Sequence, residues 1–161
     1  MKPILLATDG SSTAVEATEK AIALARALGV PLIVASIWDL DYVPVGYTLG
    51  FVTAVPDLDR LSRESAEKVA ESAAEQAREA DVDVETVVRR GFPTQQICEI
   101  ADENDVQLIV VGSHGWGAVR RVVFGSVSTG VLHHAKQPVL VVPSSVRRET
   151  ERDGTRVQTE V

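Results

Sequence analysis

The sequence has little of the residues from which several kinds of site are built. Cys98 is its only cysteine, which excludes an intramolecular disulfide framework, a CxxC redox pair and a four-cysteine zinc site. Cys98 falls on the apolar side of a predicted helix, so we expect it in the core. No apolar run approaches the roughly 20 residues that cross a bilayer, and Met1 leads into the first apolar segment without the layout of a signal peptide. We therefore expect a cytoplasmic protein without a membrane partner.

Clusters of positive charge are also missing. The formal net charge is -7, and the 16 lysines and arginines are scattered along the chain. Nucleic-acid binding depends on grouped basic side chains that neutralise phosphates, so we expect no DNA or RNA partner. The length of 161 residues suits one domain with a single core.

Short apolar segments alternate with helical patterns along most of the chain. Five strands are predicted, at residues 4–8, 32–37, 82–88, 108–111 and 139–142. Between them the apolar spacing predicts four helices, ending at Gly29, over 56–80, around 97–101 and over 126–135. This alternation predicts an α/β fold with a five-stranded parallel sheet, doubly wound and Rossmann-like, which binds ligands at the carboxyl ends of its strands.

Local patterns predict where further elements begin or lie. Thr13 and Glu16 have the spacing of a capping box, which predicts the start of the first helix. Val84 and Val88 alternate with charged residues, which predicts a strand at a sheet edge. Residues 38–55 hold both tyrosines without a clear period and are predicted to form a long loop. Residues 146–161 are polar and charged and are predicted to be a flexible tail, which leaves residues 1–145 as the domain.

A glycine-spaced segment follows the most apolar strand. Gly112-Ser113-His114-Gly115 comes first, and Gly125-Ser126-Val127-Ser128 follows nine residues later at a predicted helix start. Glycine lets the backbone approach a phosphate, and a helix N-terminus offers unpaired N–H groups and a positive dipole end. The hydroxyls of Ser126 and Ser128 can add donors. Glycines that only form tight turns are the alternative, but three at this spacing favour a phosphate-binding loop.

Generic motifs do not account for this segment. No Gly-Lys-Ser/Thr follows, as a Walker A sequence requires, and Gly115 and Gly117 lack the third glycine of a dinucleotide fingerprint. The GxSxG elbow of α/β-hydrolases is absent. A phosphoreceiver domain is disfavoured, because Asp9 stands alone after the first strand and Pro143 follows the last.

Over residues 2–143 the sequence resembles the universal stress protein family. The ATP-binding branch of that family carries G-x2-G-x9-G-S/T between the fourth strand and the fourth helix, and the matching residues are Gly112, Gly115, Gly125 and Ser126. The opening segment 4–11 and the closing segment 138–143 are similar as well. The resemblance implies a strand order of 3-2-1-4-5, with adenine near the ends of the first two strands and phosphates on the glycine loop.

The resemblance also implies a site at the level of residues. Asp9 matches the family aspartate beside the nucleotide, and Ile37 matches the position whose backbone meets adenine. The implied nucleotide-binding residues are Ala7, Thr8, Asp9, Ile37, Gly112, Ser113, His114, Gly115, Gly125, Ser126, Val127 and Ser128. Asp9 is also a candidate Mg²⁺ ligand, with a helix-capping Asx turn as the alternative. For His114, Arg120 and Arg121, phosphate contact and simple exposure to solvent remain equally open.

These features favour a nucleotide-binding stress-response module with regulatory or protective action. ATP is the expected ligand, and Mg²⁺ can accompany it. The phosphate loop comes without a base, nucleophile or metal cluster of convincing spacing, so binding is favoured over turnover. The alternative is a slow ATPase or a nucleotide- or phosphate-transfer enzyme, with Asp9 and His114 as its acid–base groups.

The last predicted strand favours a homodimer. Val139 to Val142 are apolar on both faces and carry none of the charges that protect an exposed edge. Antiparallel pairing of this strand with its copy would cover it, and the resemblance also implies such a dimer. The alternative is that the tail after Ser144 covers the same edge.

Overall fold

Strands and helices alternate along the computed structural model, which describes residues 1–38, 58–113 and 125–143. The elements are β1 (Ile4–Ala7), α1 (Ser12–Leu28), β2 (Leu32–Trp38), α2 (Leu58–Glu79), β3 (Val84–Arg90), α3 (Pro93–Glu103), β4 (Leu108–Gly112), α4 (Ser126–His134) and β5 (Val139–Val142). This order confirms the predicted α/β class. The predicted loop lies outside the described residues except for Trp38, and so do the flexible tail and the domain boundary at residue 145.

The strands form one parallel sheet in the order β3-β2-β1-β4-β5, which confirms the implied topology. The chain runs outward from β1 to β3 and then crosses to β4 and β5, so the order reverses between β1 and β4. Ala7 at the end of β1 is level with Ala35 of β2 and Val111 of β4. In open parallel sheets, ligands bind at the carboxyl ends of the strands beside such a reversal.

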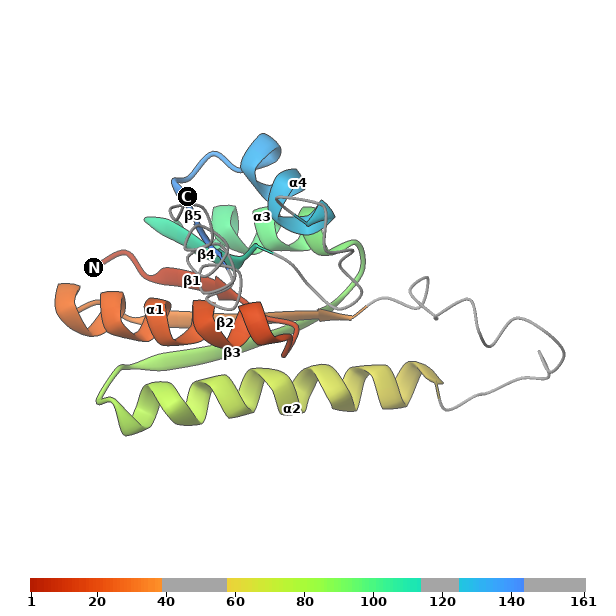
Figure 1. Ribbon diagram of the computed structural model, residues 1–161, viewed down its shortest axis with the longest axis horizontal. Coiled ribbons are helices and arrows are strands. Elements are labelled where there is room, and N and C mark those ends of the chain that lie inside the picture. The colour runs from red at the N-terminus through yellow and green to blue at the C-terminus, as the bar shows by residue number, and fades with distance from the viewer. Residues whose placement is uncertain (39–57, 114–124, 144–161) are drawn as a thin grey trace, which may run out of the picture.

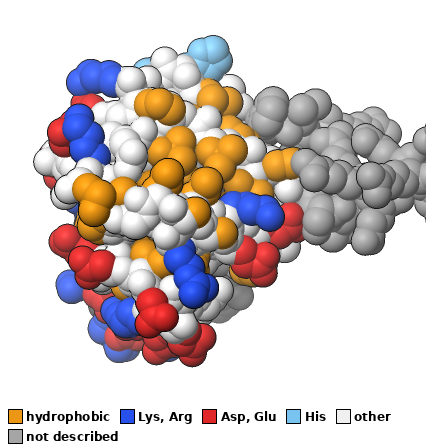
Figure 2. Space-filling view, turned by 90° about the vertical axis from the view of Figure 1, so that its left-hand side faces the viewer, with side chains coloured by type: hydrophobic (Ala, Val, Ile, Leu, Met, Phe, Trp, Pro, Cys, Tyr) orange, Lys and Arg blue, Asp and Glu red, His pale blue; other side chains and the backbone are white. Residues whose placement is uncertain are grey.

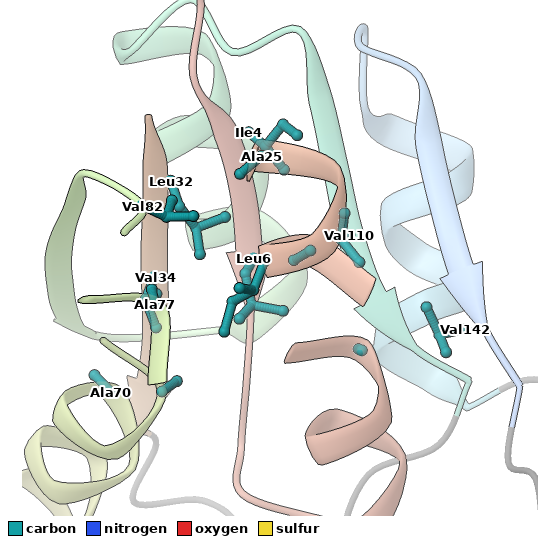
Figure 3. Packing of buried hydrophobic residues seen from close by; sticks show 14 residues of the cluster. Ile4, Leu6, Ala25, Leu32, Val34, Ala70, Ala77, Val82, Val110 and Val142 are labelled. Carbon is teal, nitrogen blue, oxygen red and sulfur yellow. The ribbon is translucent and has the colours of Figure 1, made fainter. Parts of the chain in front are cut away.

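Helices cover both faces of the sheet (Figure 1). One core cluster packs α1 and α2 against side chains such as Leu6, Leu32 and Val34 (Figure 3). The other core cluster packs α3 and α4 against the strand residues that alternate with these, among them Leu5 and Ile33. Successive side chains of a strand point to opposite faces, so continuous apolar strands supply both clusters.

The start of α1 differs from the prediction. Ser11 is the N-cap, and its hydroxyl accepts the Ala14 N–H at 3.4 Å. The Ser11 N–H in turn donates to the Asp9 carboxylate at 3.0 Å, which makes an Asx turn. The capping box predicted for Thr13 and Glu16 is therefore wrong, because the helix begins earlier and Thr13 is a buried residue within it.

The start of β3 also differs from the prediction. The Val82 N–H donates to the Ala77 carbonyl at 2.9 Å, and the Asp81 N–H donates to the Arg78 carbonyl at 3.0 Å. These are the two hydrogen bonds of a Schellman motif, so Val82 closes α2 and packs in the core. The strand begins at Val84 instead, and its place at the sheet edge is as predicted.

The surface mixes charged and apolar areas. Figure 2 shows hydrophobic side chains gathered in the middle of one face, with acidic and basic side chains mostly around and below them. Cys98 is only partly buried rather than fully in the core, and desolvation of its thiol raises its pKa. Among the described helices, none combines the length and the apolar character that a membrane span needs.

Candidate functional site

The candidate site lies at the end of β1, the strand between β2 and β4. Thr8 continues the strand, since its N–H donates to the Ala35 carbonyl at 2.9 Å, and its side chain is buried. Asp9 is exposed, and Gly10 then turns the chain at a φ of +75°. The chain therefore leaves the sheet between Thr8 and Gly10, and Asp9 lies at the point of exit.

The helices that follow the two neighbouring strands β1 and β4 at this edge are α1 and α4. Gly125 caps α4 without a side-chain hydrogen bond, and its carbonyl accepts the Thr129 N–H at 3.0 Å as the first bond of the helix. The N–H groups of Ser126, Val127 and Ser128 precede that bond and have no acceptor within the helix. With the positive end of the helix dipole, they form a place where an anion such as a phosphate can bind.

Ser113 joins the ends of two strands to the start of α4. Its N–H donates to the Val142 carbonyl at 2.8 Å, and its carbonyl accepts the Gly125 N–H at 2.6 Å. The Ser128 hydroxyl lies 3.2 Å from the Ser113 carbonyl and 3.0 Å from the Gly125 carbonyl. Ser113 and Ser128 are each 2% exposed, so these bonds form in a desolvated place at the base of the site.

Gly112 and Gly125 differ in how far their positions require glycine. A Cβ on Gly112 would lie 2.9 Å from the carbonyl carbon, carbonyl oxygen and Oγ1 of Thr13. Glycine at position 112 therefore lets α1 pack directly on β4. Gly125 has φ of -71° and ψ of 164°, a region that any residue adopts. Its backbone conformation therefore does not require glycine.

The end of β2 lies beside that of β1, on the side away from β4. Ile37 is partly buried against the α3 and α4 side of the core. Trp38 stands beside Arg90 in the strand register, with the guanidinium carbon 5.4 Å from the ring centroid. Arg90 also pairs with Asp59 at 3.5 Å. This Trp38–Arg90 pair was not predicted, because the register of two strands joined by a helix has no local signal in the sequence.

Asp9 is the candidate for a metal ligand. Its Oδ1 accepts the Ser11 N–H, and a carboxylate has further lone pairs that can bind a cation. Mg²⁺ in nucleotide sites is commonly held by one or two carboxylates together with phosphate oxygens and water. Within residues 1–38, 58–113 and 125–143, no group of three or more histidine, cysteine, aspartate and glutamate side chains is placed to hold a metal ion by itself.

The structure places most of the predicted site residues at one edge of the sheet. Those at the strand ends are Ala7, Thr8, Asp9, Ile37, Gly112 and Ser113, and those at the start of α4 are Gly125, Ser126, Val127 and Ser128. His114 and Gly115 lie outside the described residues, as do Arg120 and Arg121. Thr13 is an addition, since only packing in space reveals its contact with Gly112.

Comparisons with known proteins agree with this architecture. The model of the universal stress protein family matches residues 1–143. Universal stress protein YxiE of Bacillus subtilis is 33% identical over 144 residues, which cover 86% of this chain and 97% of the relative.

Two solved structures are similar to the chain along most of their length. The structure of MJ0577, from Methanocaldococcus jannaschii, has a TM-score of 0.76 at 26% identity and covers 89% of this chain and 96% of its own. The universal stress protein from Archaeoglobus fulgidus in complex with dAMP has a TM-score of 0.64 at 26% identity, and the match covers 88% of this chain and 98% of that protein.

Proposed function

The chain belongs to the universal stress protein family, and we therefore propose that it binds adenine nucleotides, with ATP as its ligand. The observation that carries the proposal is the start of α4, where three N–H groups without helical acceptors follow a glycine cap at the carboxyl edge of the sheet. The similar Archaeoglobus fulgidus protein is in complex with dAMP, which supports an adenine nucleotide as the ligand class.

In the proposed site the phosphates lie at the start of α4, and the adenine lies at the end of β2. The N–H groups of Ser126, Val127 and Ser128 receive the phosphates, and the exposed Ser126 hydroxyl adds a donor. The backbone at Ile37 receives the adenine, and Asp9 binds the ribose or a Mg²⁺ ion on the phosphates. Roles for His114 and Gly115 in the same site remain predictions from the sequence.

We propose binding rather than turnover as the activity, in a homodimeric cytoplasmic protein with a regulatory or protective role under stress. Asp9 already orders the turn before α1 through Ser11, which suits a residue that holds a ligand in place. The enzymatic alternative, slow ATP hydrolysis or a transfer reaction, would use Asp9 and His114 as acid–base groups.

Titration calorimetry of Gly125→Val tests the proposal. A valine side chain at this cap would occupy space that a phosphate needs, while φ and ψ at this position suit valine. We expect ATP binding to be lost while the thermal midpoint falls only slightly, by the small effect of a poorer N-cap. Titration of ATP, ADP, AMP and adenosine into the unmodified protein then shows how much of the affinity comes from the phosphates.

The control is Gly29→Asn, at the far end of α1. A Cβ on Gly29 meets no atom within 4 Å, and asparagine tolerates the positive φ found there. This variant should bind ATP like the parent. Undiminished ATP affinity in Gly125→Val would show that the phosphate assignment is wrong. Mass spectrometry of nucleotide released from the purified, denatured protein would identify the base.

A further inference from the structure

We infer that Ser128 is a positioning residue whose buried hydroxyl fixes the start of α4 against the end of β4. The sequence alone suggested that both Ser126 and Ser128 offer hydroxyl hydrogens to a phosphate. The structure separates the two, because Ser126 is exposed whereas Ser128 is 2% exposed with its hydroxyl between two backbone carbonyls. Where it concerns affinity, the inference rests on the proposed nucleotide site.

The geometry is that of a shared hydrogen bond. A serine hydroxyl has one hydrogen, and the Ser128 oxygen lies 3.0 Å from the Gly125 carbonyl oxygen and 3.2 Å from that of Ser113. The Gly125 N–H reaches the same Ser113 carbonyl at 2.6 Å. Ser113 and Gly125 are therefore joined twice, once directly and once through the hydroxyl of Ser128.

This arrangement determines what Ser128 can give to a ligand. Its hydroxyl hydrogen is engaged with carbonyls, so it is not available to a phosphate while the start of α4 keeps this position. Its backbone N–H, in the first turn of the helix, is still free of a helical acceptor. Ser128 thus contributes an N–H group to the proposed site, and Ser126 contributes the hydroxyl.

Loss of the Ser128 hydroxyl should loosen the site without unfolding the domain. The Ser113 carbonyl would keep the Gly125 N–H, and the Gly125 carbonyl would keep the Thr129 N–H, so neither acceptor is left without a partner. Alanine is smaller than serine and a better helix former. The variant loses the second link between Gly125 and the end of β4. The N–H groups at the start of α4 are then less well held, so they bind an anion less tightly.

Three variants of the full-length protein test the inference. Ser128→Ala removes the hydroxyl, and Ser128→Thr retains it. Thr18→Val is the matched control, because Thr18 is also 2% exposed and its hydroxyl donates to the Ala14 carbonyl at 2.8 Å within α1. The measurements are amide hydrogen exchange at Gly125 by nuclear magnetic resonance, ATP affinity by calorimetry, and unfolding in urea.

We expect Ser128→Ala to speed exchange at Gly125 about fivefold beyond the change at core amides, and to weaken ATP binding about three- to tenfold, as the loss of one hydrogen bond does. Ser128→Thr should restore both quantities, and Thr18→Val should lower the urea midpoint alone. Unchanged exchange at Gly125 in Ser128→Ala would overturn the inference, as would faster exchange with unchanged ATP affinity. If the parent protein bound no nucleotide, the proposed function would fail, whereas the exchange experiment would still decide whether the hydroxyl holds Gly125.

Discussion

Asp9 has two roles to fill at the scale of a single residue. Its carboxylate accepts the Ser11 N–H at 3.0 Å and thereby sets the entry into α1. The same carboxylate lies exposed at the carboxyl edge of the sheet, where the proposed site would use its charge for a Mg²⁺ ion or a ribose. The first role needs only an oxygen acceptor, whereas binding of Mg²⁺ depends on the negative charge.

Asp9→Asn separates these roles, because an asparagine side chain keeps the acceptor and loses the charge. We expect Asp9→Asn to unfold at the same urea concentration as the parent, and to lose the difference in ATP affinity between Mg²⁺ and EDTA. Asp9→Ala should lose both the turn and this Mg²⁺ effect. Equal Mg²⁺ dependence in Asp9→Asn and the parent would leave Asp9 with a capping role only.

The rate of ATP hydrolysis should be measured for the parent and for Asp9→Asn as well. Ordinary enzymes turn over about 1 to 1000 times per second, and we expect ATP hydrolysis by this protein to be well below that range. The enzymatic alternative would be favoured if the parent hydrolysed ATP at a rate inside that range, and if Asp9→Asn lost the hydrolysis but still bound ATP.

The site could be predicted from the sequence as a place, but not contact by contact. Glycine spacing and the end of an apolar strand are both local in the chain, and they are enough to predict a site at the carboxyl edge of the sheet. The clash that keeps residue 112 a glycine depends on Thr13, which is distant in the sequence. The bonds from Ser128 to Ser113 likewise cross from a helix to a strand.

At the scale of elements, three helices end in the same way. After α1, α2 and α3, the residue that reverses the chain has a positive φ, and these residues are Gly29, Asp81 and Asp105. Each is followed by a residue whose N–H returns to the last turn of the helix. Only the glycine was recognised in the sequence, because glycine is the usual residue at this position and aspartate is not.

Asp81→Gly should therefore stabilise the protein. An aspartate at a φ of 58° carries steric strain that glycine avoids, and its charge lies near the negative end of the α2 dipole. We expect the free energy of unfolding to rise by about 0.5–1 kcal/mol in urea titrations. Asp83→Gly is the control, because it removes the same charge two positions later without relieving a positive φ. A glycine there should lower stability, by about 0.5–1 kcal/mol, and equal gains in both variants would assign the effect to charge.

The existence and type of each described element were predictable, while their boundaries were less so. Apolar periodicity repeats several times within an element and therefore survives a few exceptions. A boundary depends on one or two residues, and Val82 shows the difficulty, because the same apolar side chain suits a strand and the closure of α2. Strand order rested on the family resemblance, since no pattern in the sequence specifies which strands are neighbours.

At the scale of the whole molecule, the two edges of the sheet differ in character. β3 forms one edge, and Glu85 and Arg90 along it are exposed. β5 forms the other edge and consists of valine and leucine alone, with Leu140 36% exposed. In the described part of the chain, β5 pairs with β4 and has no strand on its other side. Charged side chains protect an edge from pairing with another chain, and β5 has none.

We therefore predict that the protein is a homodimer in which the β5 strands of two chains pair antiparallel. Leu140→Asp should give monomers or insoluble protein in light scattering at micromolar concentration, because a charge placed between paired apolar edges is buried without a partner. Glu85→Lys, on the opposite edge, is the control and should leave the molar mass unchanged. Deletion of residues 146–161 separates this arrangement from one in which the tail covers β5. A dimer that persists without the tail supports strand pairing, since the edge is then covered by its copy. A parent protein that is monomeric, and that dimerises only after the deletion, would instead identify the tail as the cover of β5.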